Sequence, residues 1–241
     1  MDGAHPSQLN STPLALAMAP PATEQDCRMH IRTLRCELAR PPKTNGKLVV
    51  VLHGRGDSSA GFHWMPNTMA LPGVSWLLVN APDPWYGGFS WYGMPPDHGP
   101  SVRRSQALLD ELFDEVEDQG FASEDIVLFG FSQGCLLTLE WGGRTQRKLA
   151  GCIGVSGYCY DPTALGAEAS EAAKTRPWLV THGFQDDVLP YEVTKAQIDE
   201  LKAAGLPLDF RGYNKPHTID PDLQDIRQAM ITMLGLSVTP A

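Results

Sequence analysis

The sequence lacks any long apolar run and any concentration of positive charge. No stretch of its 241 residues approaches about 18 uninterrupted apolar side chains, so we expect no membrane-spanning helix and no integral membrane contact. Lys and Arg number 19 against 28 Asp and Glu, which gives a net charge of −9. No run of basic residues forms a positive stripe, and nucleic acid is therefore not expected as a partner.

Cysteine is also scarce. There are five, an odd number, and they form neither a Cys-x-x-Cys pair nor a Cys/His spacing that suits zinc (Cys27, Cys36, Cys135, Cys152 and Cys159). A chain of this length does not need disulfides to build a core. We therefore expect reduced, mostly buried thiols in a cytoplasmic protein, and no metal site.

The composition is that of a globular protein, with 42% hydrophobic and 20% charged residues. Residues 1–25 are the exception, because Ala, Pro, Ser and Thr dominate there. The apolar patch at 14–19 has no Lys or Arg ahead of it and is too short for a signal peptide. We predict a flexible N-terminal tail over 1–25 and one domain over 26–241.

Continuous apolar runs indicate strands that are buried on both faces. The clearest is 47–52, which contains three consecutive valines, and similar runs follow at 75–79, 126–131, 152–155, 178–181 and, more weakly, 208–213. Alternation of apolar and polar residues between Met29 and Leu38 predicts an edge strand.

Helical periodicity fills the gaps between these runs. Apolar stripes lie over 102–116 and over 193–201 after Pro190, and a third follows Asp220-Pro221, which we interpret as an N-cap and a first helical residue. Strands alternating with helices predict an α/β fold with a mainly parallel central sheet and helices on both faces. In such a sheet, functional groups gather at the carboxyl ends of the strands.

The run 126–131 leads into Gly130-Phe131-Ser132-Gln133-Gly134, followed by a helix-like stretch. Gly-x-Ser-x-Gly between a strand and a helix is the pattern of a nucleophile elbow, in which a strained turn exposes the serine hydroxyl. The glycines are needed because side chains there would collide with neighbouring backbone. The N–H of Gln133, at the start of the helix, is a candidate donor to an oxyanion. The alternative is a Gly-rich turn with a spectator serine.

Three other strand ends carry polar residues. Run 47–52 is followed by His53-Gly54-Arg55-Gly56-Asp57. This segment matches neither of the common phosphate-binding loops, and one of its backbone N–H groups could be a second oxyanion donor. Run 178–181 is followed by Asp186 and Asp187, either of which could be the acid of a Ser-Asp-His order. Among the seven histidines, His217 alone follows both the serine and the acid in a loop after the last strand.

Taken together, these segments resemble the phospholipase/carboxylesterase family of α/β-hydrolases, which includes acyl-protein thioesterases and small bacterial carboxylesterases. The matching pieces are 52–57, Ser90-Trp91-Tyr92, the elbow, His182-Gly183 with Asp186 and Pro190, and His217. The resemblance implies an α/β-hydrolase fold, Ser132 as nucleophile, Asp186 as acid and His217 as base. It also implies oxyanion donors at the main-chain N–H groups of Arg55 and Gln133, with no cofactor.

Two positions depart from the family pattern. Pro216 precedes His217 where the family often has glycine, and Arg55 stands where a leucine is common in the thioesterases. The N–H of Arg55 would serve equally as a donor. Its charge at the rim of the site argues against a preference for long acyl chains.

Aromatic residues cluster between 85 and 92. One interpretation is a loop packed on the core, and the other is an apolar wall over the nucleophile that would bind substrate. The second interpretation predicts a substrate-binding set made up of Trp85, Phe89, Trp91, Tyr92, Met65 and Leu189, with Met94 as a further candidate.

We predict a serine hydrolase of carboxylic esters or thioesters, with a small-molecule substrate of short to medium acyl length, or one of the lysophospholipid or acyl-protein type. Hydrolysis of amide or carbon–carbon bonds by the same triad is an alternative. A non-catalytic binding protein on the same scaffold is another. A homodimer is compatible with the sequence.

Overall fold

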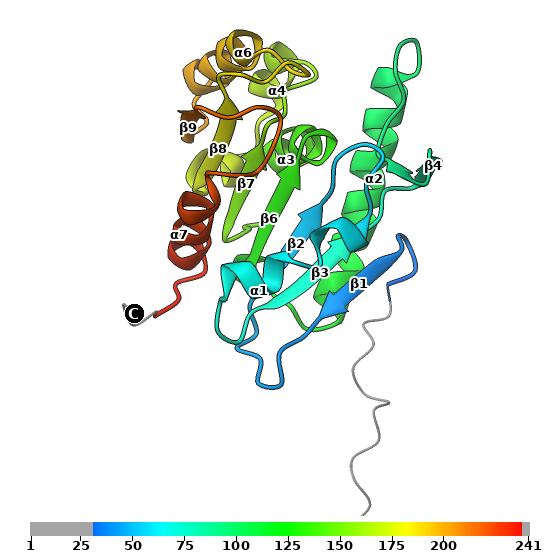
Figure 1. The fold of residues 1–241 in the computed structure, drawn as a ribbon, viewed down its shortest axis with the longest axis vertical. Coiled ribbons are helices and arrows are strands. Elements are labelled where there is room, and N and C mark those ends of the chain that lie inside the picture. Colours follow the sequence, from blue (N-terminus) through cyan, green and yellow to red (C-terminus); the bar gives the residue numbers. More distant parts are fainter. Residues whose placement is uncertain (1–30, 238–241) are drawn as a thin grey trace, which may run out of the picture.

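The computed structural model describes residues 31–237, so the predicted tail at 1–25 lies outside the described residues. A seven-stranded sheet of order β1-β3-β2-β6-β7-β8-β9 runs through residues 31–237 (Figure 1). The edge strand β1 is antiparallel to β3, and every other neighbouring pair is parallel. The strands are β1 (Cys36–Ala39), β2 (Leu48–Leu52), β3 (Ser75–Val79), β6 (Ile126–Phe131), β7 (Gly151–Val155), β8 (Trp178–Gly183) and β9 (Leu208–Tyr213).

The strand predictions are confirmed, with differences at their ends, of which those of β8 and β1 exceed one residue. Every residue of β2, β3, β7 and β8 is buried, as expected for strands that are covered on both faces. Strand β8 continues to Gly183, because His182 and Gly183 pair with Gly212 and Tyr213 of β9. The edge strand begins at Cys36, and the start of its predicted stretch at Met29 lies outside the described residues.

Helices cover both faces of the sheet, as predicted (Figure 1). One face is covered by α2 (His98–Asp118), α3 (Gln133–Arg144), α4 (Pro162–Glu168), α5 (Glu171–Thr175) and α6 (Tyr191–Ala203). The other is covered by α1 (Met65–Met69) and α7 (Leu223–Met233). Alternate residues of β2 divide between the two cores, with Val50 and Leu52 in the first and Val49 and Val51 in the second. A separate hairpin is formed by β4 (Asp83–Trp85) and β5 (Gly88–Ser90).

The predicted start of the last helix is wrong by two residues. Helix α7 begins at Leu223 with Asp222 as its N-cap, so Asp220 and Pro221 lie ahead of it. The Asp222 side chain does not cap the helix, because its carboxylate accepts hydrogen bonds from Thr181 and from the buried Nζ of Lys215. The ion pair joins Lys215 and Asp222 across the loop that carries His217, and the Thr181 hydrogen bond ties that loop to β8.

The four described cysteines are free thiols. Cys135, Cys152 and Cys159 are buried, and burial raises the pKa of Cys135 to about 12. These thiols are therefore protonated and unreactive at neutral pH. Within residues 31–237, no helix combines the length and apolar character needed to cross a membrane.

Candidate active site

Ser132 occupies a strained turn between β6 and α3. Its φ of 54° and ψ of −113° are unusual for a residue with a side chain. A Cβ on Gly130 would overlap the Gly134 carbonyl, and one on Gly134 would overlap the Leu52 carbonyl, so both positions require glycine. The Ser132 N–H donates to the Val155 carbonyl at 2.9 Å, which holds the turn to β7. The predicted elbow geometry is thus present.

Ser132, His217 and Asp186 lie in a hydrogen-bonded line. The Nε2 of His217 is 3.0 Å from the Ser132 Oγ, and its Nδ1 is 2.7 Å from Oδ2 of Asp186. The Asp186 side chain is fully buried, whereas that of His217 is 16% exposed. A neutral imidazole that donates from Nδ1 to the carboxylate leaves Nε2 free to accept the serine proton.

The structure distinguishes Asp186 from its neighbour Asp187. The second oxygen of Asp186 accepts the N–H groups of Val188 and Leu189 at 3.0 and 2.8 Å, while Asp187 is exposed. His182 packs beneath Asp186, with its Nε2 at 2.8 Å from the Leu189 carbonyl. Burial lowers the pKa of His182. A neutral His182 that donates to Leu189 therefore helps to hold the loop around Asp186.

Arg55 and Gln133, whose main-chain N–H groups are the predicted oxyanion donors, both lie beside Ser132. Neither main-chain N–H donates to an acceptor within residues 31–237, and both residues line the same cavity as the serine. Gln133 is the first residue of α3, where unpaired N–H groups and the helix dipole favour negative charge. The pair can therefore hold an oxyanion.

The side chain of Gln133 fixes the aromatic segment. Its Oε1 accepts the Trp91 N–H at 2.9 Å and the Ser90 hydroxyl at 3.2 Å, and its Nε2 donates to the Tyr92 carbonyl at 3.0 Å. The indole N–H of Trp91 donates to the His53 carbonyl at 2.9 Å. These bonds join the end of β2, the elbow and residues 90–92 into one rigid unit.

Part of the predicted substrate-binding set is wrong. Trp91 and Met65 are fully buried, Trp91 in the core beneath α2 and α3 and Met65 in the core on the opposite face of the sheet. Trp85 and Phe89 also do not line the cavity at Ser132. Trp85 lies against the Arg55 guanidinium, and Phe89 exchanges main-chain hydrogen bonds with the 56–57 turn. The aromatic segment is thus mainly a packed element, the first of the two interpretations.

Tyr92, Met94 and Leu189 do line this cavity, which has a volume of about 500 Å³. Tyr158 and Val188, which were not predicted from the sequence, line it too. Tyr158 follows the carboxyl end of β7 by three residues, so its position along the chain was a usable signal. The complete lining is Gly54, Arg55, Asp57, Tyr92, Met94, Phe131, Ser132, Gln133, Tyr158, Val188, Leu189 and His217.

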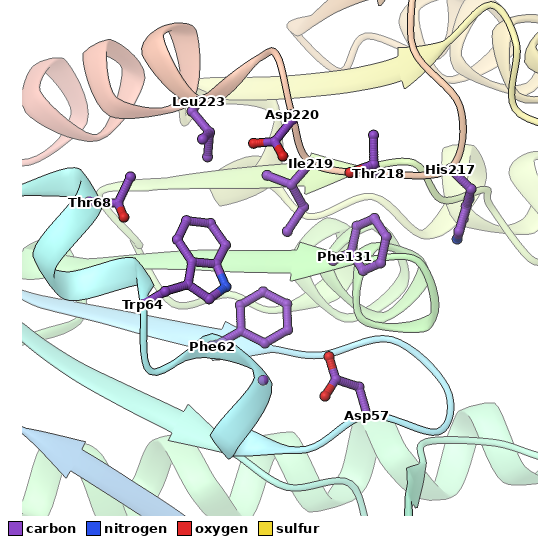
Figure 2. Close-up of a pocket in the computed structure, with 11 residues that line it drawn as sticks. Asp57, Phe62, Trp64, Thr68, Phe131, His217, Thr218, Ile219, Asp220 and Leu223 are labelled. Carbon is purple, nitrogen blue, oxygen red and sulfur yellow. The ribbon is translucent and has the colours of Figure 1, made fainter.

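A second hollow of about 530 Å³ shares Asp57, Phe131 and His217 with the first. Figure 2 shows His217 at one end of it, Phe131 and Ile219 pointing into it, and Thr68 and Leu223 at the other end. Ser132 does not line this hollow. Two spaces therefore meet at the imidazole, one beside the serine and one beyond the histidine. Among residues 31–237, no group of three or more His, Cys, Asp or Glu side chains is arranged to hold a metal ion.

Comparison with known proteins gives a consistent match. The model of the phospholipase/carboxylesterase family matches residues 35–234. Acyl-protein thioesterase 1 of Schizosaccharomyces pombe is 30% identical over 196 residues, which cover 74% of this chain and 88% of that protein. Acyl-protein thioesterase 1 homolog 1 of Dictyostelium discoideum is 32% identical over 186 residues, or 69% of this chain and 80% of that protein.

Solved structures agree with the sequence matches. The crystal structure of Zea mays acyl-protein thioesterase 2 superposes with a TM-score of 0.70 at 27% identity, covering 83% of this chain and 99% of that one. The α/β-hydrolase architecture predicted from the resemblance is therefore confirmed.

Proposed function

Because the chain belongs to the phospholipase/carboxylesterase family and is a hydrolase of carboxylic esters or thioesters, we propose that Ser132, His217 and Asp186 are its catalytic triad. The observation that supports this most strongly is the pair of hydrogen bonds of His217, at 3.0 Å to the Ser132 hydroxyl and 2.7 Å to Asp186. One ring nitrogen of His217 can therefore act as a general base toward Ser132, while Asp186 orients the ring through the other nitrogen.

In this mechanism His217 takes the Ser132 proton while the hydroxyl oxygen attacks the acyl carbon. The N–H groups of Arg55 and Gln133 stabilise the oxyanion, and Asp186 stabilises the imidazolium. His217 then gives its proton to the departing alcohol or thiol. A water molecule, with His217 as its base, then attacks the acyl carbon of the acyl-enzyme. This releases the carboxylic acid and restores Ser132. No cofactor takes part in this scheme.

The cavity beside Ser132 suits acyl groups of short to medium length, with Tyr92, Met94 and Leu189 in its wall. The relatives' names point to thioesters on proteins as one substrate class. Lysophospholipids are another, since the family description includes phospholipases. Buried free thiols support a cytoplasmic location. A homodimer stays a prediction, which sedimentation of the full chain tests.

The test is hydrolysis of p-nitrophenyl butyrate by Ser132→Ala. Removing the nucleophile should lower kcat by about 10⁴-fold or more. Ser58→Ala is the matched control, because that serine lies on the neighbouring 54–58 loop and its hydroxyl makes no hydrogen bond within residues 31–237. A Ser132→Ala enzyme that retains a tenth of the wild-type kcat would refute the assignment.

A further inference from the structure

Arg55 brings an unpaired positive charge into the cavity beside Ser132. Its Nη2 is 3.1 Å from the Met94 sulfur, and its guanidinium carbon lies 5.3 Å over the Trp85 ring. No carboxylate within residues 31–237 forms an ion pair with it, and its Nε is buried without a hydrogen-bond partner there. A guanidinium that lines a cavity and has no carboxylate partner can bind an anion there through its terminal N–H groups.

Further polar groups surround this charge. The Tyr158 hydroxyl, which lines the same cavity, lies 3.2 Å from Nε2 of His98, and the Tyr92 ring stacks on His98 with 5.1 Å between ring centres. Burial raises the pKa of Tyr158, and the charge of Arg55 acts in the opposite direction, as expected for a guanidinium near the phenol. Both phenols are therefore neutral at pH 7 and can donate a hydrogen bond.

The nearest acidic side chains are engaged elsewhere. One oxygen of Asp57 accepts the Ser58 N–H at 2.8 Å, and the carboxylate lies against Gly61, toward the second hollow (Figure 2). Glu140, behind Tyr158 and His98, is buried and paired with Arg144 at 2.6 Å, and its other oxygen accepts the Tyr160 and Asp161 N–H groups. Asp57 lines the same cavity but forms no ion pair with Arg55, so the guanidinium has no carboxylate partner among residues 31–237.

The geometry also indicates which part of a substrate meets Arg55. The leaving oxygen must lie near Nε2 of His217, which protonates it, so the leaving group extends into the second hollow, which contains His217 without Ser132. The oxyanion lies at the N–H groups of Arg55 and Gln133. The remaining bond of the tetrahedral carbon then directs the acyl chain into the cavity of Ser132, Tyr158 and the Arg55 side chain.

We infer that Arg55 binds a carboxylate at the far end of the acyl group, so that half-esters or half-thioesters of dicarboxylic acids are preferred substrates. The inference depends on the proposed function, since it assumes acyl transfer to Ser132. The carboxylate would accept hydrogen bonds from the terminal N–H groups of the guanidinium and from the Tyr158 hydroxyl. Charge-assisted bonds of this kind make an Arg–carboxylate contact specific.

The experiment compares substrates that differ only in the distal group: p-nitrophenyl hydrogen adipate against p-nitrophenyl hexanoate, and hydrogen suberate against octanoate. The readout is the ratio of kcat/KM, acid over neutral, for each pair. Arg55→Leu should lower this ratio by about ten- to a hundredfold, mostly through KM, because the lost charge-assisted bonds bind the ground state as well. Arg55→Lys should give an intermediate ratio, and added salt should lower the wild-type ratio.

Arg211→Leu is the matched control, since Arg211 pairs with Asp209 and Asp225 away from the cavity and should keep the wild-type ratio. Circular dichroism checks that each variant is folded. Equal ratios in wild type and Arg55→Leu, with both esters hydrolysed, would overturn the inference and leave the proposed function intact. An Arg55-dependent gain on para-carboxyphenyl hexanoate instead would also overturn it, because the anion would then belong to the leaving group. A wild-type enzyme that hydrolyses none of these esters would contradict the proposed function itself.

Discussion

His182 donates its Nε2–H to the carbonyl oxygen of Leu189 at 2.8 Å and so closes the loop that carries Asp186. The same nitrogen is 3.4 Å from Oδ2 of Asp186. Because the Val188 and Leu189 N–H groups bind the other oxygen, the carboxylate has a single orientation, with Oδ2 toward His217. A buried carboxylate held in this way can keep an imidazole in one tautomer.

Asp186→Asn should therefore lower kcat for p-nitrophenyl butyrate by about 10⁴-fold, because an amide favours the wrong tautomer of His217. Asp187→Asn is the matched control one residue away. Its side chain is exposed, and we expect kcat to stay within about threefold of wild type. Steady-state kinetics of both variants at one pH make the comparison. Equal losses, or the reverse order, would contradict the choice of Asp186.

The wall of the acyl cavity can be tested with two methionines that the structure separates. Met94 lines the cavity, whereas Met65 is buried in the core beneath α1 and α7. Met94→Ala should lower the octanoyl-to-acetyl ratio of kcat/KM by about three- to tenfold, since a buried methylene contributes about 0.8 kcal/mol. Met65→Ala should keep that ratio and instead lower the free energy of unfolding by about 2–5 kcal/mol.

Chain-length kinetics on p-nitrophenyl esters and urea unfolding of both variants provide the two measurements. If Met65→Ala changes the acyl-length ratio and Met94→Ala does not, the cavity beside Ser132 is not the acyl site.

The features that could be predicted are those whose sequence pattern lies within one segment of the chain. A buried parallel strand such as β2 is a run of apolar residues, and the elbow needs glycine at 130 and 134 because neighbouring carbonyls leave no room for a side chain. The order of strand ends then places Ser132, Asp186 and His217 at the same edge of the sheet. Periodicity and a short motif were therefore sufficient for the fold, for Ser132 and for His217, whereas the choice of Asp186 over Asp187 came from the family resemblance.

The residues that line the cavity beside Ser132 could not be predicted in this way, because their positions depend on contacts between segments that are distant in the sequence. Trp91 was predicted to form part of the cavity wall. Its indole N–H instead donates to the His53 carbonyl and its main-chain N–H donates to Gln133, so the ring is buried in the core. Asp222 takes the N-cap position of α7 in place of Asp220, and its carboxylate accepts hydrogen bonds from Lys215 and Thr181, which lie outside the helix. The position of Tyr158 after β7 was a local signal, but its contact with His98 of α2 joins segments that are distant in the sequence.

Acid should destabilise the fold through His53. This side chain is buried, its Nδ1 donates to the Gly54 carbonyl at 2.6 Å, and its Nε2 accepts the Ala81 N–H at 3.0 Å, so the ring is held neutral. Burial lowers the pKa of His53 below its ordinary 6.5, and the same holds for His182. Below pH about 6.5 these histidines bind protons in the unfolded chain but remain neutral in the folded state. The free energy of unfolding therefore falls with falling pH.

Urea unfolding at pH 7.5, 6.5 and 5.5 measures this dependence. We expect little change above neutrality and a loss below pH about 6.5, by up to about 1.4 kcal/mol per pH unit for each such histidine. His53→Gln, which can still accept the Ala81 N–H, should show a shallower loss. An identical slope in His53→Gln and wild type would show that His53 does not contribute.

The most direct test of the triad is peptide mass spectrometry after treatment of the full chain with a fluorophosphonate. An activated serine attacks phosphorus and displaces fluoride, so one phosphonyl group per chain should appear on Ser132. His217→Ala should prevent the reaction, because Ser132 would have no base to take its proton. Phosphonylation of another residue, or equal labelling of Ser132 in His217→Ala and wild type, would contradict the Ser132–His217–Asp186 assignment.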